Sequence, residues 1–138
     1  PYTTLFRSYE LLNSIKGIGT INAMNTIIHT NNFQAFETAR QYACYLGIAP
    51  FEHSSGTSIK GKTRVYPTGA KLLKADLSQA ANSAIVWDKE MKEYYERKRK
   101  EGKAYGVVLN AVKFKLVGRM FAVVKRGTPF VELMTYKK

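Results

Sequence analysis

Two adjacent serines stand before a glycine in a part of the chain that is rich in cations. Ser54 and Ser55 precede Gly56, a residue type that lets the backbone turn sharply. A serine hydroxyl that attacks a phosphodiester needs positive charge nearby to stabilise the charge that develops on the phosphoryl oxygens. We therefore expect one of these two serines, Ser54 or Ser55, to act as a nucleophile. The cations that would bind phosphate close to it are Lys60, Lys62, Arg64, Lys71 and Lys74.

Residues 56–63 also match the phosphate-loop pattern G-x-x-x-x-G-K-[ST]. A phosphate loop follows a buried apolar strand and opens a helix, whose N-terminal amides hold the phosphates. Here polar residues precede the match, and the residues after it run into Pro67, which does not start a long helix. The context therefore disfavours a nucleotide-binding site, which would predict ATP or GTP binding that Lys62→Ala abolishes.

The charge of the chain indicates the class of its partner. Its 138 residues are enough for one domain with a core, and 22 Lys and Arg against 10 Asp and Glu give a formal net charge of +12. Such an excess favours a polyanion, and nucleic acid is the first candidate. The long apolar run Val107–Val124 is interrupted by Lys113, Lys115 and Arg119, which predicts a core helix and no membrane span.

The single cysteine bears on the compartment and on metal binding. Cys44 has no partner in the chain for a disulfide and lies in an apolar helical pattern, which favours a reducing cytoplasm. One cysteine and the two histidines at positions 29 and 53 do not supply a zinc ligand set. The acidic residues are scattered, so we expect no metal and no cofactor to bind this part of the protein.

The first eight residues, PYTTLFRS, read unlike the remainder of the chain. They match the in-frame translation of a common sequencing adapter, so we expect residues 1–8 to be non-native and leave them out of the predicted fold. The predicted helical domain then spans residues 9–129, and residues 130–138 form a tail. We expect the native reading frame to extend further upstream.

Two short helices joined by a glycine turn are predicted at the start of the domain. Residues 9–15 and 20–30 have helical periodicity, and Lys16-Gly17-Ile18-Gly19 lies between them. Two glycines around an apolar residue permit a tight turn whose exposed amides can bind a DNA phosphate, as in a helix-hairpin-helix. We expect Lys16, Gly17 and Gly19 to contact phosphate. A plain helical hairpin is the other interpretation.

The rest of the domain is predicted to be helical, so the fold class is all-α. A short β-ribbon or loop is expected after the Ser-Gly turn, over about residues 57–66. The other predicted elements are helices over about Ala35–Leu46 with Gly47 as the stop, from near Thr68 to about Val86, from the N-cap Asp88 to about Glu101, and over about Tyr105–Arg126.

Two groups of side chains could contact nucleic acid but also have a purely structural interpretation. The predicted helix 89–101 is rich in Lys and Arg and could follow a phosphate backbone, or it could be a solvated face offset by its glutamates. Five aromatic residues on apolar helical faces are expected to lie in the core and not to stack on bases. These are Tyr42, Tyr45, Trp87, Phe114 and Phe121.

Several segments, in order along the chain, resemble the C-terminal half of the DEDD insertion-sequence transposases. The likeness extends over nearly all of residues 9–133, and ordered matches are more specific than any single motif. The matching residues are Leu12-x-x-Ile15-Lys16-Gly17-Ile18-Gly19, Phe36-x-x-x-Arg40-Gln41-x-Ala43-x-Tyr45-Leu46-Gly47-Ile48-Ala49-Pro50, Ser55-Gly56, Tyr94-Tyr95-x-x-Lys98, Glu101-Gly102-Lys103 and Phe121–Pro129.

This resemblance implies a serine-dependent, RNA-guided DNA recombinase in a bacterial cytoplasm. The family serine falls on Ser55, which would form a covalent phosphoserine link to DNA, and Ser54 is the fallback. The resemblance also implies a separate N-terminal RNase-H-like domain whose acidic residues bind Mg²⁺, a guide RNA, and assembly into a homo-oligomer. The alternative is a non-catalytic helix-hairpin-helix module that only binds nucleic acid.

Overall fold

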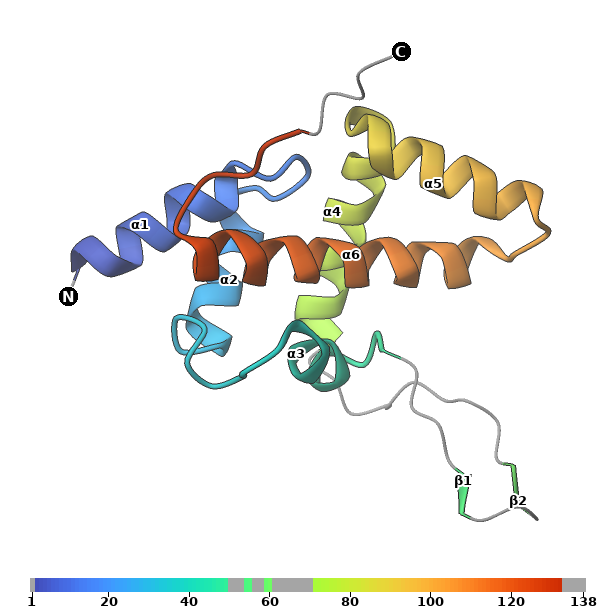
Figure 1. Cartoon of the computed structure of the whole chain (residues 1–138), viewed down its shortest axis with the longest axis horizontal. Coiled ribbons are helices and arrows are strands. Elements are labelled where there is room, and N and C mark those ends of the chain that lie inside the picture. Colours follow the sequence, from blue (N-terminus) through green and yellow to red (C-terminus); the bar gives the residue numbers. More distant parts are fainter. Residues whose placement is uncertain (1, 50–53, 56–58, 61–70, 133–138) are drawn as a thin grey trace.

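The computed structural model describes residues 2–49, 54–55, 59–60 and 71–132, and this part of the chain is mainly helical (Figure 1). The fold class predicted from the sequence is confirmed at that level. The elements are α1 (Tyr2–Asn13), α2 (Thr20–His29), α3 (Ala39–Leu46), β1 (Ser54–Ser55), β2 (Ile59–Lys60), α4 (Lys71–Trp87), α5 (Lys89–Lys100) and α6 (Tyr105–Arg126).

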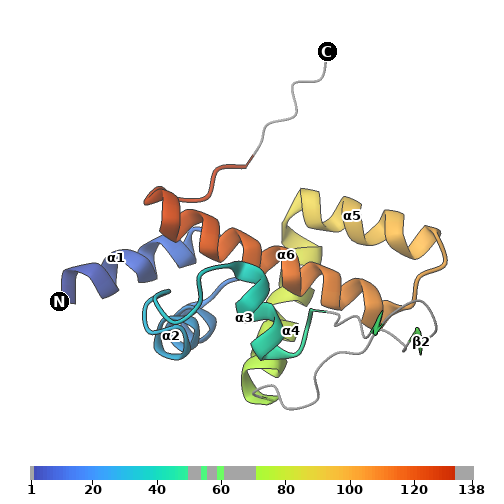
Figure 2. The same cartoon turned by 60° about the horizontal axis from the view of Figure 1, so that its bottom comes forward.

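Helix α6 is the centre of the fold. It contacts α1, α3, α4 and α5, and Figure 2 shows α5 on one side of it and α3 on the other. The apolar run that the sequence assigned to a core helix is this element, and its buried residues recur every three or four positions, as a helix packed on several sides requires. They are Val108, Leu109, Val112, Leu116, Val117, Met120 and Val123.

None of the helices in the described part of the chain is long and apolar enough to cross a membrane. In α6 the apolar residues face the neighbouring helices, while Lys115 on the same helix is exposed. The amphipathic pattern of α6 is therefore explained by packing within the domain.

Local end signals fixed most helix boundaries as predicted. The Asp88 side chain accepts a hydrogen bond from the Met91 amide at 3.0 Å and begins α5. Gly47 and Gly127 end α3 and α6 in the left-handed conformation, with φ of 74° and 75°. The predicted start of α3 at residue 35 was wrong, because Thr38 caps the helix by accepting a hydrogen bond from the Gln41 amide.

Helix α1 begins at Tyr2, within the segment that was left out of the predicted fold. Ser8 is 5% exposed, and the Arg7 guanidinium donates to the Gly127 carbonyl at 3.1 Å. The adapter-like residues therefore extend the first helix and reach the end of α6. Their non-native origin stays a prediction.

The predicted ribbon after the Ser-Gly turn differs from the strands in the structure. β1 and β2 pair antiparallel, so the two serines form one strand of the pair and do not precede it. The remainder of the predicted ribbon, from residue 61 onward, lies outside the described residues.

The turn between α1 and α2 packs tightly on α4. Gly17 has φ of +95°, and a Cβ atom there would lie 2.7 Å from the Ala80 carbonyl oxygen and 3.1 Å from the Ala84 Cβ. Ile15 and Ile18, on either side of it, are buried. Glycine is therefore required at position 17 for two reasons: the backbone has a positive φ, and α4 leaves no room for a side chain.

Two of the aromatic residues expected in the core are exposed. Trp87 is 72% and Tyr45 43% exposed, while Tyr42 is buried at 2%. Burial raises the pKa of Tyr42 to about 12. Trp87 is the last residue of α4, where the chain turns into α5. The apolar periodicity of α4 therefore does not predict whether the Trp87 side chain packs against another helix.

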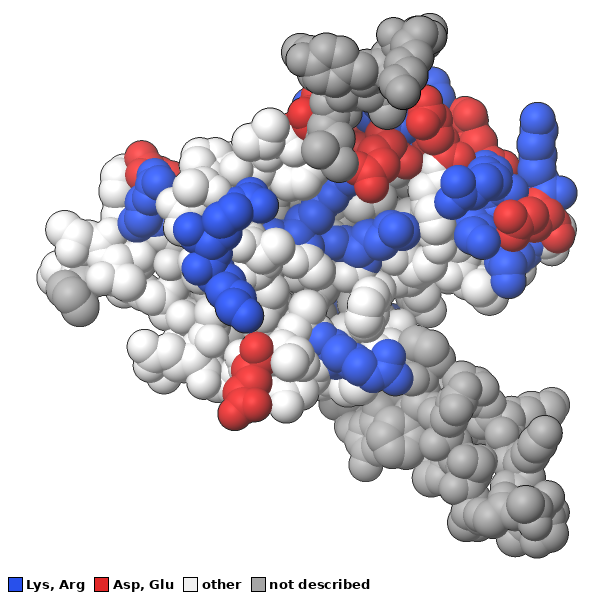
Figure 3. All heavy atoms as spheres, in the orientation of Figure 1, with Lys and Arg blue, Asp and Glu red and all other residues white. Residues whose placement is uncertain are grey.

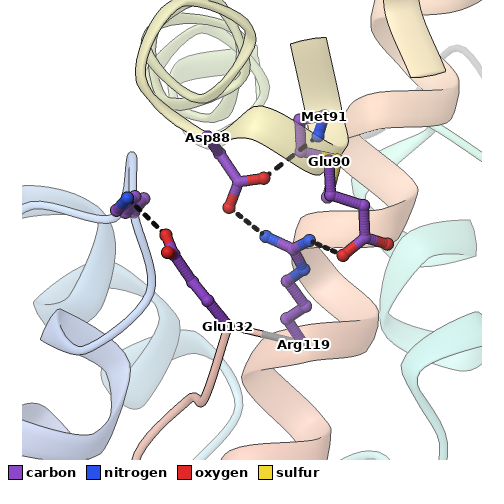
Figure 4. Close-up of polar contacts among 6 residues, drawn as sticks. Asp88, Glu90, Met91, Arg119 and Glu132 are labelled. Atoms are coloured by element: carbon purple, nitrogen blue, oxygen red, sulfur yellow. Dashed lines mark hydrogen bonds and ion pairs between the residues drawn. The ribbon is translucent and has the colours of Figure 1, made fainter. Parts of the chain in front are cut away.

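A buried carboxylate joins the start of α5 to α6 (Figure 4). Asp88 is 2% exposed, and its second oxygen accepts from Arg119 at 2.7 Å. Arg119 also donates to Glu90 at 2.9 Å and lies 4.4 Å above the Phe130 ring. The carboxylate thus caps one helix and pairs with a cation from another, which fixes the two helices relative to each other.

We predict that Gly17→Ala lowers the free energy of unfolding by about 2–3 kcal/mol, because alanine is strained at this φ and its methyl group meets α4. Gly19→Ala is the matched control. A Cβ at Gly19 meets nothing within 4 Å, so its cost should stay below about 1 kcal/mol. Urea unfolding followed by circular dichroism measures both, and equal losses would contradict the packing role.

We predict that Asp88→Ala costs about 3 kcal/mol of unfolding free energy, because it removes a cap and leaves Arg119 without its buried partner. Glu90→Ala removes the other carboxylate of the same arginine. Glu90 is 64% exposed, so its loss should cost less than about 1 kcal/mol. Thermal unfolding of the two variants compares them directly, and a larger cost for Glu90→Ala would refute the ranking.

Candidate nucleic-acid interface

The predicted nucleophile lies in the connection between α3 and α4. In the strand pair of this connection, Ser54 stands opposite Lys60 and Ser55 opposite Ile59. Residues opposite each other in an antiparallel pair are close in space. The register therefore places the backbone of Lys60, a predicted phosphate-binding residue, beside Ser54, the alternative nucleophile. Lys62 and Arg64 lie outside the described residues.

The phosphate-loop alternative is not supported by the elements that its residues form. Ile59 and Lys60, in the middle of the matched pattern, are strand residues paired with β1. In a phosphate loop these positions belong to the loop that wraps the phosphates, between a strand and a helix. Residues 56–58 and 61–63 of the pattern lie outside the described residues.

Two predicted phosphate-binding lysines lie at the start of α4, next to the end of α3. Lys71 is exposed, and Lys74 is half-buried and donates to the Gly47 carbonyl at 3.3 Å. Gly47 caps the C-terminus of α3, where the helix dipole and the free carbonyl groups attract a cation. Lys74 therefore fixes its ammonium group at the point where the serine-bearing connection leaves α3.

A third lysine, Lys113 of α6, lies near Lys74 and was not among the phosphate-binding residues predicted from the sequence. Lys113 is 4% exposed, and its one hydrogen bond within the described residues is a long one, 3.4 Å, to Asn110. Burial lowers the pKa of Lys113, and the positive charge of Lys74 lowers it further. The two ammonium groups therefore repel each other at a place where an anion would relieve the repulsion.

The helical phase of Lys113 was a signal that could have identified it. It lies one turn after Leu109 and one turn before Val117, both on the buried stripe of α6. A lysine on such a stripe is buried against its intrinsic preference, which is uncommon without a functional reason. From the sequence, Lys113 was considered only as an interruption of an apolar run.

The turn that was predicted to bind phosphate lies elsewhere on the domain. Gly17 packs against Ala80 and Ala84, more than a helical turn along α4 from Lys74. Lys16 forms an ion pair with Glu132. Gly19 is the N-cap of α2 in an extended conformation. The structure therefore does not bring Lys16, Gly17 and Gly19 together with the lysines at the start of α4.

Helix α5 carries cations and carboxylates together. Figure 3 shows basic side chains along α6 and side chains of both signs over α5. Three cations surround the ring of Tyr94, with Lys115 at 4.6 Å, Arg97 at 5.6 Å and Lys98 at 5.9 Å from its centroid. Lys98 also pairs with Glu101 at 3.2 Å. This face is partly neutralised, in accord with a solvated helix surface as well as with a contact to phosphate.

Within the described residues, no three His, Cys, Asp or Glu side chains are placed so that they could hold a metal ion. Cys44 is a free thiol and is half-buried.

The family model described as "Transposase IS116/IS110/IS902 family" matches residues 9–96. This range begins in α1, includes the connection that carries the two serines, and ends in α5.

Full-length relatives match most of the chain. It is 30% identical over 118 residues to the 43.6 kDa protein of insertion element IS110 from Streptomyces coelicolor, a match that covers 86% of the chain and 29% of that protein. It is 27% identical over 123 residues to proteins named as pilin gene-inverting proteins from Moraxella bovis and Moraxella lacunata, with 88% of the chain and 38% of each protein covered. The chain thus spans about a third of the length of these relatives.

We predict that Lys113→Met raises the free energy of unfolding by about 1 kcal/mol at neutral pH, because it removes a buried charge that has no carboxylate partner among the described residues. The same variant should weaken binding to a short DNA duplex. Lys103→Met, which removes an exposed charge, is the control and should leave stability unchanged.

The pH dependence gives this prediction a second test. Because the folded-state pKa of Lys113 is lowered from 10.5, the folded chain loses this proton first, and its stability relative to the methionine variant rises with pH up to about 10.5. Urea unfolding at neutral pH and near 10.5 should therefore show the difference shrinking. A difference that does not depend on pH would contradict a lowered pKa of the buried Lys113.

Proposed function

Because the chain belongs to the IS116/IS110/IS902 transposase family, we propose that it is the C-terminal domain of an insertion-sequence transposase that binds DNA and carries the nucleophilic serine. The family match over residues 9–96 carries this proposal, since it includes both candidate serines. The net charge of +12 supports a polyanionic partner. The relatives named as pilin gene-inverting proteins support DNA rearrangement as the outcome.

The proposed reaction is a transesterification at a DNA phosphate. The Ser55 oxygen forms a bond to phosphorus, the bond from phosphorus to one strand end breaks, and that end leaves as a hydroxyl. The serine proton passes to a base, and the leaving oxygen takes up a proton. The phosphoserine ester retains the energy of the broken bond, so a hydroxyl of another strand can reverse the step without a further energy source. Ser54 is the alternative nucleophile.

The lysines beside the serine-bearing connection have a defined part in this proposal. Lys74 and Lys113 present positive charge at the end of α3, and the backbone pairing puts Lys60 in the same connection. Negative charge accumulates on the phosphoryl oxygens in the transition state, and fixed cations stabilise it there. We propose that these lysines, with Lys62, Arg64 and Lys71, hold the phosphate backbone near the reacting serine.

The relatives are about three times as long as the segment that matches this chain. We therefore propose further components for the full-length protein. An N-terminal RNase-H-like domain would bind Mg²⁺ through its acidic residues, and a guide RNA would select the DNA. Strand exchange between two duplexes needs more than one serine, so we propose a homo-oligomer. We place this activity in the bacterial cytoplasm, where the DNA substrate lies.

A non-catalytic nucleic-acid-binding module is the second candidate, and the packing of the α1–α2 turn bears on it. The helix-hairpin-helix interpretation requires the turn amides for phosphate, whereas Gly17 is held against α4. Binding by Lys16 and Gly19 alone would then be weak. The basic surface around α4 and α6 would account for binding in either case.

The test is a covalent adduct. The full-length protein, its RNA and its target DNA are incubated with Mg²⁺, and a protein–DNA adduct that resists denaturation is measured by gel electrophoresis. We predict that Ser55→Ala abolishes the adduct and that Ser58→Ala, the control, does not. An adduct that persists in Ser55→Ala and disappears in Ser54→Ala moves the nucleophile by one residue. A wild-type protein that binds DNA but forms no adduct would favour the binding module.

A further inference from the structure

A hollow of about 500 Å³ lies between the α2–α3 connection and the C-terminal half of α6. Figure 2 shows the connection next to the C-terminal half of α6, and Phe33 of the connection contacts Phe121 of α6 with ring centroids 4.9 Å apart. The hollow is lined by aromatic rings, an amide, two charged residues and smaller side chains. Its aromatic, amide and charged residues are Asn32, Phe33, Phe36, Glu37, Phe121 and Lys125.

The rings around the hollow are not stacked on one another. Phe33 and Phe121 meet edge to face, at 80°. Phe36 is tilted by 52° against Tyr42. Phe33, Phe36 and Phe121 are each half-buried, so part of each ring remains accessible. Planar ligands gain from contact with such ring surfaces, and a nucleobase is a planar ligand of this kind.

The backbone that forms one wall is strained. Asn31, Asn32 and Phe33 have φ of 48°, 53° and 66°, a conformation that is uncommon for residues other than glycine and least favourable for a bulky one such as phenylalanine. The fully buried Thr30 holds this run, because its hydroxyl accepts from the Phe33 amide at 2.9 Å. Strain held in this way by surrounding contacts is common at ligand sites.

A polar atom of this wall has no hydrogen-bond partner within the described part of the chain. This atom is the buried side-chain oxygen of Asn32. A buried acceptor without a partner is energetically unfavourable. If the Asn32 side chain turned toward a donor in the hollow, its oxygen would gain a hydrogen bond and lose none. The carboxylate of Glu37, at the exposed rim, is a second acceptor.

The charges at the rim discriminate between possible occupants. Lys125 is exposed at the hollow and suits a phosphate, while the acceptors of Asn32 and Glu37 suit N–H donors. A nucleotide carries both groups: its base has N–H donors on one edge, and its backbone has a negatively charged phosphate. Guanine has adjacent N–H donors on one edge and fits two acceptors better than a base with one donor.

We propose that this hollow binds one unstacked nucleobase, preferably guanine, of a single-stranded or locally opened nucleic acid. The base would contact Phe33, Phe36 and Phe121, its donor edge would face Asn32 and Glu37, and its phosphate would face Lys125. The inference rests on the proposed nucleic-acid role of the domain. It adds a site on the α3–α6 side that reads a base, in addition to lysines that contact only phosphates.

The test separates a base from its backbone. Fluorescence anisotropy compares the binding of the chain to a labelled strand of abasic sites with one central guanine and to the same strand without any base. We expect the guanine strand to bind about tenfold more tightly, because the base contacts the rings and its donor edge meets the acceptors of the hollow at the same time. Deoxyribose and ribose versions of the strands distinguish DNA from RNA as the source of the base.

Two variants connect the preference to the hollow. Asn32→Gly removes the amide and suits the left-handed backbone, so it should lose the guanine preference without a lower melting temperature. Phe36→Leu keeps an apolar side chain but removes the ring and should also lose the preference. Tyr95→Leu, an aromatic residue of α5 outside the hollow, is the control and should retain it.

The outcomes distinguish this inference from the proposed function. Equal binding of the two strands by the wild type, or a guanine preference that survives both Asn32→Gly and Phe36→Leu, would overturn the nucleobase site while leaving DNA binding intact. No binding of either strand at low salt would overturn the nucleic-acid role as well. A preference lost in the two variants and kept in Tyr95→Leu supports the site.

Discussion

The burial of α6 by four other helices is the constraint on which the rest of the structure depends. A helix covered on several sides must be apolar around most of its circumference. Any charged side chain on it needs an ion-pair partner or access to solvent. Arg119 has its partner in Asp88, and that carboxylate in turn caps α5. Within the described residues, Lys113 has a long hydrogen bond to Asn110 and no carboxylate partner, and it repels Lys74. Arg119 thus stabilises the fold, whereas Lys113 is a buried charge that the described side chains do not neutralise.

The burial of α6 also requires the helices around it to pack closely against one another. Helix α4 contacts both α6 and α2, and its inner face carries small residues, Ala80, Ala81 and Ala84, all fully or nearly fully buried. The α1–α2 turn reaches this face only because Gly17 has no side chain. A glycine turn that resembles a phosphate-binding motif therefore has a packing explanation.

Local signals predicted the helices well, while contacts between distant residues decided what was missed. The N-cap at Asp88 and the glycine stops at Gly47 and Gly127 act within one helical turn, so the sequence contains them in full. The exposure of Trp87 and the pairing of Arg119 with Asp88 depend on which helices meet, and periodicity within one segment does not contain that information. Of the candidate site, the sequence predicted Lys74 from its charge and missed Lys113 and the hollow beside Asn32, because each depends on the packing of α6 against other elements.

The locally unfavourable features of the described structure gather at the two ends of α3. Before it lie the left-handed run at 31–33 and the orphaned oxygen of Asn32. After it, Lys74 donates to the cap at Gly47 and faces the buried Lys113. Elsewhere, caps, apolar stripes and ion pairs agree with local rules, and folded sequences tend to depart from those rules where a ligand compensates. A nucleic acid could satisfy both ends, with a base for the acceptors before α3 and phosphates for the lysines after it. The short helix α3 would then orient one strand relative to the connection that carries Ser55.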